Sequence, residues 1–493
     1  MKELSTLAAE REMDLLFVFP VVQYYNVPAG GPQAAEHRAF LQHTYPEWFK
    51  ADGHLDFLSP KVQQFVADQV SEFFELFPDL GGLVAHTGEM ATFSPSILKE
   101  KTALDSAVSA CMKTVYETCR KHGKLLVWDM HSAGGDTRNS DAVVEQAASG
   151  RFPGMLLTAE STYTEQEFSL TYPTTFYLNR MVAAAPSIFA QDCYGEGWDY
   201  DFIPFIVDQY LVRHFRDCEQ AGATGGGVLH YVYQGKYNAF NTLQNINIDL
   251  QTRMMWEGGE INPDEVMQHW VEKRFGTKAG PPLLSVFKKV NFILSRIFYI
   301  AGNGSWGPRY GFPKFSSMLG SPFRFIEFFS PPGTPLAGDW TRRTAKVLAI
   351  PMSAMRQEKQ EAVDQSELAL QSLTRAAAVL KAGDYSSLLA RFVALWYYAR
   401  GCQIVLEIGY YFQNAYISHY DSEAKECVAN LQKLEQSLRN VVAEARRDSR
   451  LKGLEEDVYS IGLEGRFLSV AEQFSDQLAK EIEVRSGVAG SGV

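Results

Sequence analysis

The chain has 493 residues, of which 46% are hydrophobic, and its formal net charge is -12. This length exceeds what one compact core normally holds, so two or three domains are expected. The acidic balance argues against a general polyanion-binding protein, and we expect no nucleic-acid partner. Because the nearest candidate for a membrane span, residues 290–301, is interrupted by polar side chains, we expect no membrane partner either.

The six cysteines are scattered without a CxxC pair, and Cys111 and Cys119 fall within one expected helix. This pattern is typical of free thiols and favours a reducing compartment. The sequence starts with a polar helical stretch, 2–13, instead of a signal peptide. Both features favour the cytoplasm, although a shortened chain would also lack a signal peptide, so localisation stays open.

Short apolar runs alternate with amphipathic stretches along the first half of the chain, as in βα units with parallel strands. The expected strands lie in 14–19, 83–86, 124–131, 155–160, 186–196 and 225–232. An aromatic-rich segment, 23–57, is predicted to be a long loop that covers a site. After residue 278 the chain is rich in Pro and Gly around one expected apolar helix, 284–300, and is then predicted to be helical. Apolar residues at spacings of three and four predict helices over 354–382, 385–417, 421–447 and 460–484.

Ionisable side chains follow the ends of five successive expected strands. They are Glu89, Asp129 with His131, Glu160, Asp192 with Glu196, and His230. The carboxyl ends of parallel strands meet at one edge, so these groups are expected to share a cleft. Two carboxylates in one cleft can hydrolyse a glycosidic bond: one protonates the leaving oxygen, and the other activates water or attacks the anomeric carbon.

Other chemistries have weaker signals. Asp129, His131, Asp192 and His230 would suit zinc or manganese if they converged, but no HExxH signature is present. The chain also lacks GxxxxGK[ST] and GxSxG. We therefore expect no metal and no other cofactor, while a metal-dependent barrel hydrolase and a non-catalytic carbohydrate-binding barrel stay open as alternatives.

The run 77–84 (FPDLGGLV), followed by Thr87-Gly-Glu89, resembles the fourth barrel strand of the α-glucuronidases, glycoside hydrolase family 67. Residues 124–128 are similar to that family's fifth strand, and 245–247 with 264–276 to the segment that ends its barrel. At superfamily level this resemblance implies a (β/α)8 barrel with Glu89 as general acid, an inverting reaction and a helical C-terminal domain.

Two departures from this family matter. The family holds a uronate carboxylate with basic side chains near the ends of its fifth and sixth strands, where this chain has Asp129 and Glu160. These acids would repel a uronate and favour a neutral or amino sugar, although an acidic sugar stays open. Only about six of eight strands are apparent, so either the N-terminus is incomplete or strands lie hidden in 23–57 and 163–180.

We predict an α/β protein with a (β/α)8 TIM-type barrel over 1–278, a connecting region over 279–345 and a mainly α-helical domain over 346–493. It would cleave a terminal glycosidic bond with inversion, because Glu89 and a partner two or three strands later face each other across the barrel mouth. A homodimer through the helical domain is one expected assembly. The candidate catalytic residues are Glu89, Glu160, Asp192, Glu196, His131 and Asp129. The candidate substrate-binding residues are His86, Trp128, His230, Tyr231, Tyr194 and Asn245.

Overall fold

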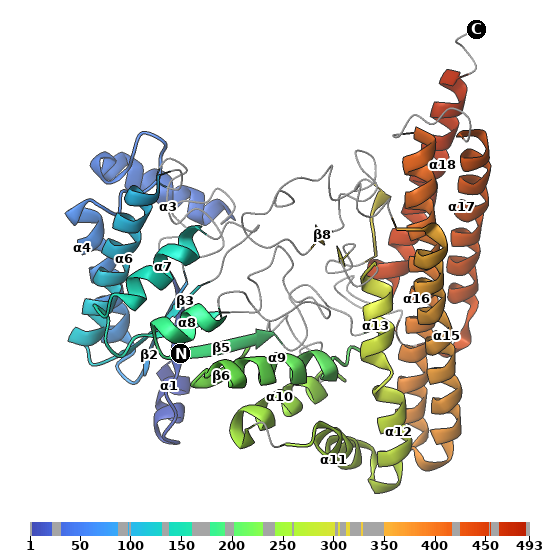
Figure 1. The fold of residues 1–493 in the computed structure, drawn as a ribbon, viewed down its shortest axis with the longest axis horizontal. Helices are drawn as coiled ribbons and strands as arrows, with labels where there is room; N and C mark the ends of the chain where they lie inside the picture. The colour runs from blue at the N-terminus through green and yellow to red at the C-terminus, as the bar shows by residue number, and fades with distance from the viewer. Residues whose placement is uncertain are drawn as a thin grey trace. The chain divides into compact units, whose positions relative to one another are not determined.

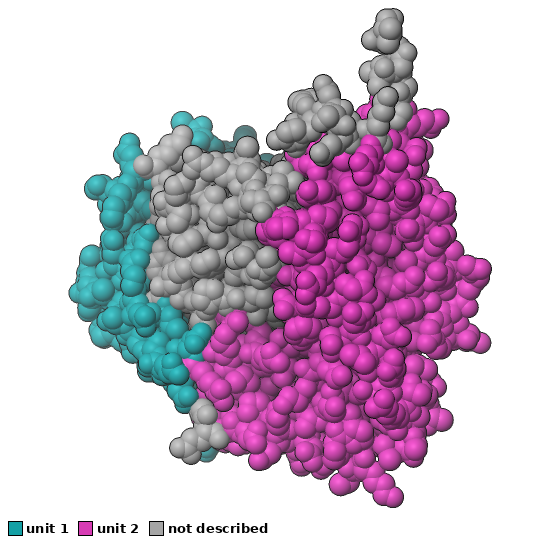
Figure 2. Space-filling model, turned by 45° about the vertical axis from the view of Figure 1, so that its right-hand side comes forward, with its two compact units in different colours: residues 1–167, 174–191, 217–227 teal, residues 168–173, 192–216, 228–493 magenta. Residues whose placement is uncertain are grey.

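The computed structural model describes most of the chain, and the fold below refers to those residues. They are 2–21, 31–86, 97, 100–130, 138–159, 178–192, 202–229, 242–258, 261–300, 304–305, 312–315, 327–328, 350–416, 424–452, 454 and 463–489. The chain divides into two compact units (Figure 2). Unit 1 comprises 1–167, 174–191 and 217–227, and unit 2 comprises 168–173, 192–216 and 228–493. The predicted boundaries at 278 and 345 stay predictions.

A sheet of six described strands, in the order β1-β2-β3-β4-β5-β6, organises the first half of the chain. The strands are β1 (Leu16–Pro20), β2 (Gly82–His86), β3 (Leu125–Asp129), β4 (Leu156–Ala159), β5 (Ser187–Asp192) and β6 (Gly225–Leu229). Neighbouring strands from β1 to β5 pair in parallel. All six expected strands are therefore present in sequential order, as βα units require, while the closed eight-stranded barrel stays a proposal.

Helices cover one face of this sheet. Unit 1 contains α1 (Lys2–Ala9), α3 (Gly31–Thr44), α4 (Pro60–Leu76), α6 (Lys101–Lys121), α7 (Arg138–Ala148) and α8 (Leu178–Ala184) (Figure 1). α4 is amphipathic and buries one stripe, Val62, Val66, Val70 and Phe74. Burying a side chain of this size stabilises the fold by roughly 1.5–3 kcal/mol. This stripe shares a core with every second residue of β2 and β3.

The alternation along each strand separates two faces. Leu83, Ala85, Leu126 and Trp128 belong to the core shared with the helices. Because successive side chains point to opposite faces of a strand, His86 and Asp129 lie on the other face. Val18 of β1 is in register with Val84 on that second face and is 55% exposed. The described strands thus leave the second face open to solvent at β1.

The predicted loop over 23–57 is wrong for its described part. Residues 31–44 form α3, Pro46–Trp48 form the short helix η1, and Leu55 and Phe57 are buried in the core of unit 1. The apolar residues of α3 do not make one continuous stripe, so the sequence carried no amphipathic signal for this helix. Within 31–57 the described strand pairing is a single bridge, Phe49 to Leu55, so no barrel strand lies there. Residues 22–30 and 160–177, where other strands were expected, fall outside the described part.

Unit 2 is mainly helical in its described part. The helix α9 (Asp208–Ala221) passes from unit 2 into unit 1. The shorter helices are α10 (Asn245–Glu257), α11 (Pro263–Phe275), α12 (Gly280–Phe287) and α13 (Val290–Phe298), and the longer ones are α15 (Met352–Ala376), α16 (Ala382–Tyr416), α17 (Ala424–Arg447) and α18 (Ser469–Ala489). The long helices, each within a few residues of its prediction except at the start of α18, pack in sequence order (Figure 1). β7 (Gly304–Ser305) and β8 (Glu327–Phe328) form a short antiparallel pair. None of the described helices is both long and apolar enough to cross a bilayer.

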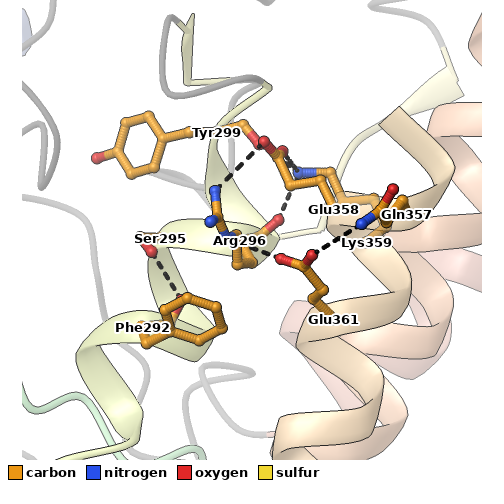
Figure 3. Close-up of polar contacts among 8 residues, drawn as sticks. All are labelled: Phe292, Ser295, Arg296, Tyr299, Gln357, Glu358, Lys359 and Glu361. Carbon is orange, nitrogen blue, oxygen red and sulfur yellow. Dashed lines mark hydrogen bonds and ion pairs between the residues drawn. The ribbon is translucent and has the colours of Figure 1, made fainter. Parts of the chain in front are cut away.

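A buried lysine joins α15 to the end of α13. The Nζ of Lys359 donates hydrogen bonds to the backbone carbonyls of Arg296 and Tyr299 and, at 2.9 Å, to Glu358 Oε1 (Figure 3). The last carbonyls of a helix have no partner within it, so this side chain satisfies groups that would otherwise be buried unpaired. Arg296 also forms ion pairs with α15: its Nη1 lies 3.7 Å from Glu358 Oε2, and its Nε lies 3.4 Å from Glu361 Oε2. Burial lowers the pKa of Lys359.

Candidate functional site

The carboxyl ends of the strands carry the residues that the sequence singled out. Asp129 and Asp192 are the last residues of β3 and β5. Glu160 and His230 directly follow β4 and β6, and Glu89 comes three residues after β2. In the sequence, these five residues therefore end or follow successive strands of one sheet. The following predicted residues lie outside the described part: Glu89, His131, Glu160, Tyr194, Glu196, His230 and Tyr231. For Asp192 the backbone is described and the side chain is not.

The structure brings His86 and Asp129 together. They are register partners at the ends of β2 and β3, and His86 Nδ1 is hydrogen-bonded to Asp129 Oδ2. Their side chains are 14% and 4% exposed. An ionised carboxylate can only accept, so Nδ1 of the imidazole carries the hydrogen, and this contact fixes the ring's tautomer and orientation. From the sequence, His86 was a candidate for substrate binding and Asp129 for catalysis, but their pairing was not predicted.

The second carboxylate oxygen of Asp129, Oδ1, is also buried. Among the residues that the structure describes, it has no hydrogen-bond partner. Leaving a buried acceptor unsatisfied costs roughly 1–3 kcal/mol, and more for a charged group. A hydroxyl group or water brought to this oxygen would remove that cost. The pair therefore places a hydrogen-bond acceptor of fixed orientation at the carboxyl ends of the parallel strands.

Two predicted substrate contacts have structural roles in the described part. Trp128 is fully buried in the core between the sheet and its helices, on the face opposite His86 and Asp129. Asn245 accepts a hydrogen bond of 2.8 Å from Trp270 Nε1 and so connects α10 to α11. Both residue types also occur in sugar-binding sites, and sequence alone does not distinguish these uses. Their predicted contact with a substrate has no support in the described geometry.

Asp208 is a buried acid that the sequence did not indicate. Asp208 is the first residue of α9 and is 5% exposed. Burial raises the pKa of Asp208 to about 6, and its Oδ1 has no hydrogen-bond partner in the described part of the chain. An acidic residue in the first turn of a helix is ordinary because it complements the helix dipole, so the sequence held no signal that this one is buried. Across the described residues, no group of three or more His, Cys, Asp or Glu side chains is arranged to hold a metal ion.

Comparison with known proteins identifies a solved structure of similar fold, but it does not identify a family. No protein-family model matches the chain, and no curated protein matches it. A solved structure of a GH138 enzyme targeting pectin rhamnogalacturonan II aligns with a TM-score of 0.57 at 12% identity, over 98% of this chain and 78% of that chain.

Two further solved structures align with TM-scores below 0.5 and carry no structural argument. One is a GH115 4-O-methyl-α-glucuronidase with specificity for decorated arabinogalactans (TM-score 0.42, 13% identity, 95% of this chain and 56% of that chain). The other is a mutant O-GlcNAc hydrolase of Thermobaculum terrenum (TM-score 0.24, 10% identity, 98% and 92%). The resemblance to family 67 stays a prediction. What the comparisons establish is that this chain shares its fold with the GH138 enzyme.

Proposed function

We propose that the protein is a glycoside hydrolase that cleaves a terminal glycosidic bond at the carboxyl ends of the sheet strands. The observation that carries this proposal is the buried pair of His86 and Asp129 on the face turned away from the helices. Within the described part of the chain, Asp129 Oδ1 has no hydrogen-bond partner. The fold shared with a glycoside hydrolase supports it at a coarse level. Acidic residues at or after the ends of β2, β4 and β5 supply the other groups that the reaction needs.

In this proposal Asp129 binds substrate and does not transfer the proton. The hydrogen bond from His86 orients the Asp129 carboxylate, so its other oxygen can accept a hydrogen bond from a sugar hydroxyl. Hydrogen bonds to the ring hydroxyls strengthen as the ring gains positive charge and supply several kcal/mol in the transition state. Glu89 is the proposed general acid, and Glu160, Asp192 and Glu196 are the candidates for the second carboxylate. The proposed contacts around the sugar are His131, His230, Tyr194 and Tyr231.

The substrate class has one starting point. The GH138 enzyme targets a pectin, so terminal sugars of pectic side chains are the first to test. The His86 partner of Asp129 offsets some of the repulsion that this acid would exert on a uronate, which keeps acidic sugars open beside neutral and amino sugars. Inversion and a homodimer through the helical part stay predictions.

A screen of 4-nitrophenyl glycosides and of rhamnogalacturonan II oligosaccharides tests the activity. Release of nitrophenol or of a single terminal sugar supports the proposal. Saccharide binding without any release would favour the non-catalytic carbohydrate-binding barrel. Activity that chelator removes and that added zinc or manganese restores would favour the metal-dependent hydrolase.

The Glu89→Gln variant tests the general acid. We expect kcat/KM to fall by roughly 10²–10⁴ on substrates with poor leaving groups, because protonation of the leaving oxygen is lost. The loss should be much smaller on 2,4-dinitrophenyl glycosides, whose leaving group departs without a proton. The exposed Glu72 of α4 provides a matched control as Glu72→Gln. Equal losses on both substrate types would reject Glu89 as the acid.

A further inference from the structure

Unit 1 carries a surface pocket that the proposed reaction does not use. Its volume is about 380 Å³, and it is lined by Tyr45, Glu47, Trp48, Lys61, Gln64, Phe65 and Asp68. This volume falls within the range of small-molecule sites, roughly 300–1,000 Å³. The lining comes from η1, the residue before it and the first turns of α4. The C-terminal end of α4 connects to the start of β2. The N-terminal turns of α4 therefore lie on the side of unit 1 where the parallel strands end.

Three aromatic rings form one wall of this pocket. Tyr45 and Trp48 are stacked, with ring centroids 4.1 Å apart and planes at 8°, and Trp48 lies 5.0 Å from Phe65. Trp48 and Phe65 also pack against the core of unit 1, which fixes their orientation. Tyr45 is 37% exposed, so part of its ring is open to a ligand. The result is a rigid aromatic platform at the surface.

Polar side chains surround the platform. Gln64 Nε2 donates to Asp68 Oδ1 at 2.7 Å, which places an amide and a carboxylate side by side. Lys61 Nζ lies 2.9 Å from Glu47 Oε1. A neighbouring donor and acceptor match two adjacent hydroxyl groups of a sugar. With two carboxylates and one ammonium group, the lining has a net negative charge that disfavours uronates and phosphates.

We propose that this pocket is a second saccharide-binding site, which takes a neutral pyranose of a glycan chain. The sugar's C–H face would lie on the Tyr45 ring, with its hydroxyls on Gln64 and Asp68. A proline-rich peptide also docks on aromatic grooves, but it offers no hydroxyl groups to the polar rim. The binding itself does not depend on the proposed hydrolase activity. If that activity is right, the site would hold a polymeric substrate near the strand ends.

Affinity electrophoresis of the full chain tests the site. Native gels would contain galactan or xyloglucan as neutral polysaccharides with pyranose units, with polygalacturonate as the acidic comparison. We expect a neutral polysaccharide to retard the wild type, and the dissociation constant to rise roughly tenfold in Tyr45→Ala and in Asp68→Ala. Two control variants should bind like the wild type: Trp256→Ala, which removes a tryptophan 91% exposed on α10, and Glu72→Gln on α4.

Four results would overturn the proposal. They are no retardation by any neutral polysaccharide, equal retardation of Tyr45→Ala and wild type, retardation by polygalacturonate alone, and displacement of bound glycan by a proline-rich peptide. Activity separates this site from the reaction. Tyr45→Ala should turn over a small aryl glycoside like the wild type while losing turnover of the polymer. A chain that binds glycan here but hydrolyses nothing would refute the hydrolase proposal and leave this site standing.

Discussion

At the scale of single residues, the Asp129 carboxylate is the group most sharply defined by its surroundings. Its Oδ2 is held by His86, and its buried Oδ1 has no partner among the residues that the structure describes. The Asp129→Asn variant keeps the shape and removes the charge, so kcat/KM should fall roughly 10–150-fold, the loss of a hydrogen bond to a charged group. Steady-state kinetics would measure this, with thermal unfolding as the check that Asn is accommodated. Unchanged kcat/KM would show that the pair only supports the fold.

Asp208 illustrates the opposite case, a buried acid that opposes folding. Its pKa is raised to about 6 by burial, whereas an unfolded aspartate titrates near 3.9. Between these values the folded state binds more protons, so stability falls as pH rises from about 4 to 6. The Asp208→Asn variant should therefore be more stable at pH 7, by on the order of 2 kcal/mol. Urea unfolding at pH 4.5 and 7 would show this, and an equal effect at both values would contradict it.

At the scale of elements, Lys359 of α15 stabilises the end of α13 through the carbonyls of Arg296 and Tyr299. The Lys359→Met variant leaves these carbonyls and Glu358 without the buried donor, and should destabilise the protein by roughly 3–5 kcal/mol. Because burial lowers the pKa of Lys359, the unfolded state binds more protons between the folded pKa and about 10.5. The lysine's contribution therefore rises with pH across that window. Denaturant unfolding of wild type and variant from pH 7 upward would measure the difference.

The exposed Lys433 of α17 supplies the control for that measurement. Lys433→Met should change the unfolding free energy little, because surface substitutions usually fall within about 0.5 kcal/mol. A difference between wild type and Lys359→Met that shrinks as pH rises would contradict the lowered pKa of the buried lysine.

The elements also show what the sequence could predict. Strands such as β2 and β3 are short apolar runs between turn residues, and helices such as α11 begin with Asn262 and Pro263 and end at Gly276. These local signals gave the elements within a few residues. The helix α3 lacks such a signal, and one predicted helix, 284–300, is two, α12 and α13. The break between them lies at residues 288–289, where neither Pro nor Gly marks it.

The site was predictable only as a set of strand ends. The sequence placed Asp129 at the end of a strand, but its pairing with His86 depends on the register between β2 and β3, which a single sequence does not reveal. Trp128 and Asp129 have different surroundings because adjacent residues of a strand point to opposite faces of the sheet. The aromatic pocket depends on the packing of η1 against α4, which no local pattern encodes.

At the scale of the whole molecule, the thiols link stability to alkaline pH. Four of the described cysteines, Cys111, Cys119, Cys218 and Cys402, are buried free thiols. Burial raises the pKa of Cys119 to about 12 and that of Cys111, Cys218 and Cys402 further. Unfolded thiols titrate near 8.5, so above that pH the folded state binds more protons and stability falls. Each such thiol removes up to about 1.4 kcal/mol for each further pH unit, a trend opposite to that of Lys359.

The Cys111→Ala variant tests this link, because Cys111 is fully buried in the core of unit 1. At pH 7 the variant measures the packing lost with the sulfur. Between pH 9 and 10 its unfolding free energy should fall less steeply than that of the wild type, by up to about 1.4 kcal/mol per pH unit. Equal slopes would mean that this thiol titrates in the folded protein as it does in the unfolded chain. In that case a thiol reagent such as dithionitrobenzoate should label Cys111 without unfolding, whereas a closed core predicts labelling only after denaturant is added.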